Sequence, residues 1–335
     1  MAGKQVKDVA LVLSSGGPRG FAYIGAIEEL ERRGYRITSV AGTSVGSLIG
    51  GIYASGKLEE FKGWLFTLDN FKLMRLLDVS ISRSYLLKGR KVIEAIKSVV
   101  PDVRIEDLEI PFTAVATDLY TGEPVLFRKG KLWEAIRASI SIPSMFKPAK
   151  ASYHTLVDGG LVSTFPLGYV QRSGHDILVG FDVNDTDVKG ITSFLKAGYK
   201  QREENKLREE TSRGVMSKVK NDKNLSLLEK VRLIGGEGGK YFRNKFKEEK
   251  VKDPLEADDN YFSILTRSFS IANHTIANLE AELRKPDVLV RMTLDSYGTI
   301  PDYAKGQEIS EKGRKLMAAA LDEYEKQATD CPQDG

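Results

Sequence analysis

The feature that most constrains the fold is an alternation of apolar runs and amphipathic segments near the start of the chain. Residues 9–15, VALVLSS, form an unbroken aliphatic run that is typical of a strand buried on both faces. After a glycine-rich break, residues 21–33 carry apolar side chains at helical spacing. A second run, ITSVAG, leads into another segment with a helical pattern. This order predicts a mainly parallel sheet with helices on its faces.

The same alternation continues along the rest of the 335-residue chain. Helices are predicted at 91–100, 132–140, 262–283 and 308–326, a hairpin at 112–119 with 124–130, and strands at 153–160, 175–184 and 286–295. We therefore expect one discontinuous α/β domain formed by residues 1–185 and 261–330, followed by a short tail at 331–335. No apolar run approaches the roughly 18 residues that a membrane-spanning helix needs.

Residues 186–260 differ in composition and are predicted to be a charged, helical insertion. They hold 18 Lys and Arg against 14 Asp and Glu, so the net charge of +4 belongs to this segment. Tyr241, Phe242 and Phe246 alternate there with basic residues, which would suit peripheral contact with anionic lipid. A helical excursion whose charges form a solvated face is the reading we favour. Nucleic acid is not an expected partner, because acidic residues are mixed throughout.

The cysteine content and the N-terminal pattern indicate a reducing compartment. Cys331 is the one cysteine and lies in the polar tail, so no internal disulfide can form. The apolar stretch near the N-terminus lacks the layout of a secretory leader and reads as a first strand. We therefore expect a cytoplasmic protein that can lie peripherally at a membrane surface.

The motif with the clearest chemistry is Gly-Thr-Ser-Val-Gly at residues 42–46, between a predicted strand and a predicted helix. This spacing lifts a nucleophilic serine, here Ser44, onto a tight turn, and Gly42 and Gly46 allow the strand and helix to approach closely. The helix that follows would direct its N-terminal amides at the reacting atom. A simple helix cap is the alternative reading.

A second glycine-rich stretch, SSGGPRG, follows the first predicted strand. It does not match the Gly-x-Gly-x-x-Gly fingerprint of dinucleotide-binding loops, because Ser15 stands at the first glycine position. Gly16 and Gly17 can turn backbone N–H groups into a cleft at this edge of the sheet, and Arg19 adds an N–H and a cation, whereas Pro18 has no N–H. The loop therefore suits an oxyanion hole, with a structural turn as the alternative.

The base that would activate Ser44 is the open question, because the chain has only three histidines, His154, His175 and His274. Each has an ordinary structural explanation. Asp158 is more suggestive, since it ends an apolar strand and precedes two glycines. A carboxylate buried in a cleft becomes a stronger base, and direct contact with the serine would make a two-residue device. A plain Asp-Gly turn explains the same spacing.

Taken together, these residues resemble the patatin-like phospholipase family. The resemblance is carried by SSGGPRGFAYIGAIEEL, by GTSVG, by VDGG, and by the block from ATDLYTGEPVLF to SIPSMFKP between the last two. It spans roughly residues 8–185 and 261–325. The presence of these elements in this order is much more specific than one Gly-x-Ser-x-Gly.

The resemblance implies a three-layer α/β/α fold and hydrolysis of lipid acyl esters, of the phospholipase A or lysophospholipase type, with no cofactor and no metal. By position, Ser44 would be the nucleophile of an acyl-enzyme and Asp158 the base. Gly16, Gly17, Arg19 and Gly20 would form the oxyanion loop. Two residues depart from the family pattern: Ser15 replaces the usual first glycine, and Pro18 removes one potential amide donor. Two other functions stay open: a Ser-His-Asp esterase, and a catalytically silent lipid-binding or regulatory module.

Overall fold

The computed structural model describes residues 7–76, 90–189, 261–293, 297 and 300–330, with scattered residues between 192 and 226. Its contacts divide the chain into two compact units, Met1–Thr186 with Arg267–Gly335, and Asp187–Thr266. The second unit covers nearly the same residues as the charged insertion, and its described residues between 188 and 221 are helical. The aromatic-basic stretch at 241–246 and Cys331 lie outside the described residues.

The first unit is built on one eight-stranded sheet, with the order β5-β6-β3-β2-β1-β7-β8 and with β4 paired to β3. The central strands β3, β2, β1, β7 and β8 are parallel, whereas β4, β5 and β6 join by antiparallel pairing. The strands are β1 (Asp8–Leu13), β2 (Arg36–Thr43), β3 (Phe112–Asp118), β4 (Pro124–Phe127), β5 (Ala149–Ala151), β6 (His154–Asp158), β7 (Ile177–Asp185) and β8 (Val288–Thr293).

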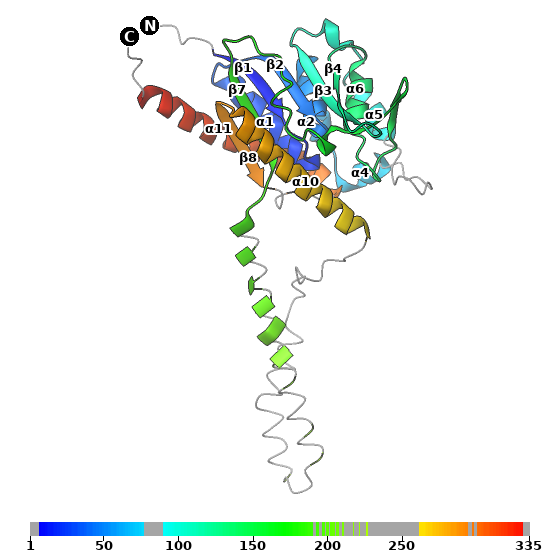
Figure 1. Cartoon of the computed structure of the whole chain (residues 1–335), viewed down its shortest axis with the longest axis vertical. Helices are drawn as coiled ribbons and strands as arrows, with labels where there is room; N and C mark the ends of the chain where they lie inside the picture. Colours follow the sequence, from blue (N-terminus) through cyan, green and yellow to red (C-terminus); the bar gives the residue numbers. More distant parts are fainter. Residues whose placement is uncertain are drawn as a thin grey trace. The chain divides into compact units, whose positions relative to one another are not determined.

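Helices cover both faces of the sheet, which gives three layers (Figure 1). Alternate side chains of β1 point to opposite faces. Val9, Leu11 and Leu13 belong to the larger apolar cluster with α1 (Ala22–Arg32), α2 (Val45–Ala54) and α11 (Gly306–Asp330). Ala10 and Val12 belong to a second cluster with α10 (Tyr261–Arg284). The remaining helices are α3 (Leu58–Leu65), α4 (Asn70–Leu76), α5 (Arg90–Lys97) and α6 (Leu132–Ser139).

The prediction of an α/β fold with a mainly parallel sheet is confirmed. The predicted helices and strands occur in the expected order, with ends shifted by a few residues. One local difference bears on function: residues Gly17–Phe21 form a short 3-10 helix, η1, before α1, and Pro18 fits its first turn because no N–H is needed there. Helices α3 and α4 and the short strand β5 are not among the elements that the sequence predicts.

The register of β3 brings two distant strand ends together. Val115 of β3 pairs with Thr43, the last residue of β2, and Ala116 pairs with Asp158, the last residue of β6. Strand β4 pairs with both Val115 and Ala116, so it fills one edge of β3 at these residues. Strands β2 and β6 must therefore both pair with the opposite edge. The carboxyl ends of β2 and β6 therefore meet opposite consecutive residues of β3.

Candidate active site

Ser44 lies on the turn between β2 and α2 with a backbone conformation that is rare for a non-glycine residue, φ 55° and ψ −122°. Strained backbone of this kind persists only where its surroundings enforce it. Here the Ser44 N–H donates to the Ser139 hydroxyl at 2.8 Å, and that hydroxyl donates to the Val115 carbonyl at 2.6 Å. The turn is thus tied through the last residue of α6 to strand β3.

The two glycines of the turn are required by close backbone approach. A Cβ on Gly42 would lie 2.3 Å from the carbonyl group of Gly46, and a Cβ on Gly46 would lie 2.2 Å from the Leu13 carbonyl oxygen. Backbone atoms cannot give way as a flexible side chain can. Strand β2 and helix α2 therefore meet at a distance that only glycine permits, and Ser44 is held at the sheet edge.

Asp158 lies beside Ser44 and is almost fully buried, with 1% of its surface exposed. Its Oδ1 accepts the Gly160 N–H at 2.8 Å. Among the described residues, its buried Oδ2 has no hydrogen-bond partner of ordinary geometry, although the Ser44 hydroxyl is near enough to lower the pKa by hydrogen bonding. Catalytic hydrogen bonds are often long before substrate binds, which reconciles the two observations.

The pKa of Asp158 is the result of opposing effects. Burial raises it, while the Ser44 hydroxyl and the Gly160 N–H lower it, and the net value is about 6 against an ordinary 3.8. Asp158 is therefore mostly ionised at neutral pH and is a stronger base than an exposed carboxylate.

The glycine loop lies at the same edge of the sheet, after β1, which is hydrogen-bonded to β2. Ser15 N–H is already used, because it donates to the Thr164 carbonyl at 2.9 Å. Gly16 and Gly17 stand at the start of η1, where the first N–H groups of a helix have no acceptor within it. These two amides are therefore the ones the loop leaves for a ligand.

Arg19 and Gly20 have different local roles from those of Gly16 and Gly17. They lie inside η1, where backbone N–H groups are used for i to i+3 bonding. The Arg19 guanidinium donates to the Val183 carbonyl at 2.9 Å and to the Tyr297 carbonyl at 2.7 Å. A Cβ on Gly20 would lie 2.3 Å from a methyl group of Val45, so Gly20 allows the loop to pack against the serine turn.

Ser15, the departure from the family's usual glycine, contributes to the surroundings of the carboxylate. Its hydroxyl accepts a hydrogen bond from Asn273 Nδ2 of α10 at 3.2 Å. Both atoms lie 3.3 Å from the position that a Cβ on Gly160 would occupy. Ser15 and Asn273 therefore pack against the turn whose N–H holds Asp158.

The structure describes all three histidines, and their rings lie in three different environments. His154 Nδ1 donates to the Asp118 carboxylate. His274 Nδ1 donates to the Asn184 carbonyl at 2.7 Å, and its other nitrogen contacts the Asn278 amide at 3.0 Å. His175 is exposed. No hydrogen bond joins any of these described rings to Ser44.

Tyr303, which the sequence analysis missed, faces the same loop. Its hydroxyl lies 3.5 Å from the position of a Cβ on Gly17, and its ring packs edge-on against Phe21 at 5.8 Å. Burial raises the pKa of Tyr303 to about 12, and the nearby charges of Arg19 and Asp158 act on it in opposite directions. Within the described part of the chain the hydroxyl has no hydrogen-bond partner. No motif surrounds Tyr303 in sequence, so only the tertiary structure reveals it.

Comparison with known proteins shows similarity to one family. Residues 11–170, just under half of the chain, match the model of the patatin-like phospholipase family. An NTE family protein of Mycobacterium tuberculosis is 42% identical over 179 residues, which are 53% of this chain and 50% of that protein. The human patatin-like phospholipase domain-containing protein 6 is 30% identical over 193 residues, 56% of this chain and 14% of the human protein.

The chain spans about half the length of the mycobacterial relatives that it matches. Among solved structures, VipD from Legionella pneumophila aligns over 96% of this chain and 67% of its own, with a TM-score of 0.41 and 11% identity. No described helix is long and apolar enough to cross a membrane. The described residues also contain no group of three or more His, Cys, Asp and Glu that could hold a metal ion.

Proposed function

We propose that this patatin-like domain is a serine acyl hydrolase that cleaves carboxylic esters of lipids, of the phospholipase A or lysophospholipase type. The observation that carries the proposal is the meeting of Ser44 and Asp158 at one edge of strand β3, where the Ser44 hydroxyl is near enough to lower the pKa of the Asp158 carboxyl. The family match and the names of its relatives, which include a neuropathy target esterase of Drosophila melanogaster, support the same class of reaction.

The proposed reaction begins when Asp158 takes the Ser44 proton as the serine oxygen attacks the ester carbonyl. The negative charge that develops on the carbonyl oxygen is stabilised by the N–H groups of Gly16 and Gly17, and each such donor typically contributes about 3 kcal/mol to barrier lowering. The Tyr303 hydroxyl, which faces Gly17, is a further donor. Asp158 then returns the proton to the departing alcohol.

Hydrolysis of the acyl-enzyme repeats the same steps with water as the nucleophile. Asp158 takes a proton from water as it attacks the acyl carbon, the same amides hold the oxyanion, and the fatty acid leaves as Ser44 regains its proton. The raised pKa of Asp158 suits both directions of transfer, because a group with a pKa near the working pH accepts and returns protons readily.

Two alternatives are less well supported. A Ser-His-Asp esterase would need a histidine ring beside the Ser44 hydroxyl. The rings of His154 and His274 are instead hydrogen-bonded to Asp118 and to the Asn184 carbonyl. A catalytically silent module would not need a buried carboxylate with an unpaired oxygen beside a strained serine, an arrangement that costs stability.

The proposal is tested with Ser44→Ala, Asp158→Asn and His154→Ala, assayed on a soluble short-chain ester and on a panel of phospholipids and lysophospholipids. We expect the first two variants to lose hydrolysis and the His154 variant to keep it. An organophosphonate probe should label wild type at Ser44 and leave Ser44→Ala unlabelled. Near wild-type turnover in Asp158→Asn, together with loss in His154→Ala, would show that a histidine is the base. Folded protein with no label at Ser44 would favour the silent module.

A further inference from the structure

Helix α4 (Asn70–Leu76) presents an apolar face to solvent. Leu73 is its buried residue, whereas Phe71 is 72% exposed and Met74 is 64% exposed. Residues three apart in a helix lie on the same face, so these two side chains stand together. Removing such side chains from water is favourable, so their exposure favours binding of any surface that can cover them.

The same helix carries two cations and no acidic residue. Lys72 and Arg75 make no ion pair within the described part of the chain. The Arg75 guanidinium lies 5.8 Å from the centre of the Phe71 ring, so charge and apolar surface are adjacent. Asp69 lies just before the helix and caps it, with Oδ1 accepting the Lys72 backbone N–H at 2.7 Å.

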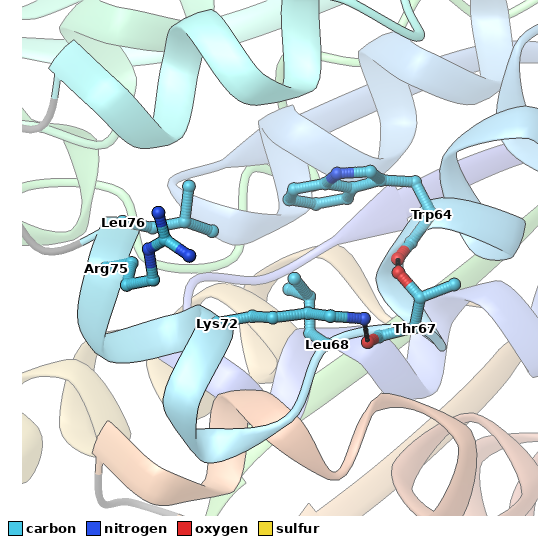
Figure 2. Close-up of a pocket in the computed structure, with 6 residues that line it drawn as sticks. All are labelled: Trp64, Thr67, Leu68, Lys72, Arg75 and Leu76. Carbon is cyan, nitrogen blue, oxygen red and sulfur yellow. Dashed lines mark hydrogen bonds between the residues drawn. The ribbon is translucent and has the colours of Figure 1, made fainter.

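A pocket of about 300 Å³ opens beside these cations (Figure 2). The side chain of Lys72 runs along it and donates to the Thr67 carbonyl at 2.7 Å, while Arg75 lies next to Leu76. Among the residues that the structure describes, its lining combines apolar and basic residues and includes no carboxylate: Trp64, Thr67, Leu68, Lys72, Arg75 and Leu76. The surface of this pocket is mainly apolar, so it fits the apolar part of a bound molecule, while Lys72 and Arg75 lie at its side.

Helix α4 is also near the candidate active site. It packs against the short helix η5 (Ile300–Ala304), and η5 in turn packs against η1 of the glycine loop. Tyr303, which faces Gly17, belongs to η5. One short element therefore separates α4 from the proposed oxyanion loop.

We propose that α4 is the element through which this chain binds an anionic lipid surface. Phe71 and Met74 enter the boundary between head groups and acyl chains, and Lys72 and Arg75 contact lipid phosphates. The pocket beside them takes part of one anionic lipid. The choice of a lipid surface over a protein partner rests on the proposed function, whereas the apolar and basic composition of α4 stands independently of it.

The test is co-sedimentation of the full chain with vesicles of phosphatidylcholine alone and of phosphatidylcholine mixed with phosphatidylglycerol. We expect stronger binding to the anionic vesicles. Lys72→Gln with Arg75→Gln should weaken that binding about thirtyfold, from roughly 1 kcal/mol for each basic residue near an anionic surface. Phe71→Ser with Met74→Ser should weaken binding to both kinds of vesicle.

The matched control is Ile271→Ser with Leu279→Ser on α10, which removes apolar side chains that are 59% and 60% exposed. It should bind as wild type does. Three results would overturn the proposal. They are equal losses of vesicle binding in the control and the α4 variants, no loss of binding in either α4 variant, and no vesicle binding by wild type. Hydrolysis of a soluble short-chain ester should be unchanged in the α4 variants. An inactive wild type would contradict the proposed function while leaving the vesicle result decisive for α4.

Discussion

Asp158→Asn is expected to stabilise the protein while removing its activity. Burial raises the pKa of this carboxyl from 3.8 to about 6, so the folded state disfavours the ionised form. The shift is about two pKa units, and at ~1.4 kcal/mol for each unit it corresponds to about 3 kcal/mol. Because the pKa of Asp158 is higher in the folded state than in the unfolded state, its ionisation does not reduce the stability of wild type below pH 4. It reduces that stability as the pH rises through 6. The variant should therefore gain up to about 3 kcal/mol at pH 8 and almost nothing at pH 4.

The assay is urea unfolding of wild type and variant at both pH values, with the free energy of unfolding compared at each. Asp176→Asn is a control for which the opposite change in stability is expected. Burial opposes ionisation of Asp176, but hydrogen bonds from the Ser173 N–H and the Arg172 guanidinium outweigh burial and hold the pKa of Asp176 low. That variant should lose stability at pH 8. If Asp158→Asn is no more stable than wild type at pH 8, the reasoning from burial is refuted.

Three further predictions concern turnover of a soluble ester. In the proposed dyad only ionised Asp158 can accept the proton. We therefore expect kcat/KM to rise with pH, to reach half its maximum near pH 6, and to fall about tenfold per pH unit below that; a flat profile between pH 4 and 6 would contradict this. Ser139→Ala leaves the Ser44 N–H without its acceptor, so it should lower the free energy of unfolding by about 1–3 kcal/mol and lower kcat more than it changes KM. Ser98 is exposed, so Ser98→Ala should change neither urea unfolding nor kinetics. Tyr303→Phe should lower kcat about a hundredfold at unchanged stability, and an unaltered kcat would show that Tyr303 is not an oxyanion donor.

Much of the fold could be predicted from local patterns. The unbroken aliphatic run at Val9–Leu13 predicts a strand buried on both faces, and the glycines at 42 and 46 predict the tight turn at Ser44. Helices α3 and α4 were missed. The exposed Phe71 and Met74 blur the helical pattern of α4, because periodicity assumes that apolar side chains face the core.

The roles of polar groups in the glycine loop were harder to predict. From sequence, Arg19 was expected to add an amide and a cation to the site. In the structure its amide lies inside η1 and its guanidinium reaches the Val183 and Tyr297 carbonyls, because partners distant in sequence decide where a long side chain is used. Tyr303 reaches Gly17 for the same reason, through packing that no nearby motif announces.

By itself, the sequence determined most of the segments that form strands and helices. It also determined which residues are chemically able to act as nucleophile, base or amide donor, since these follow from residue type and spacing. Only the tertiary structure decided that Ser44 and Asp158 are neighbours, because that depends on β2 and β6 ending opposite consecutive residues of β3. It also decided how strong a base the carboxylate is, because its pKa is set by burial among residues from several strands and loops. Spacing along a chain carries information about local geometry, whereas proximity and dielectric surroundings arise only when distant segments pack together.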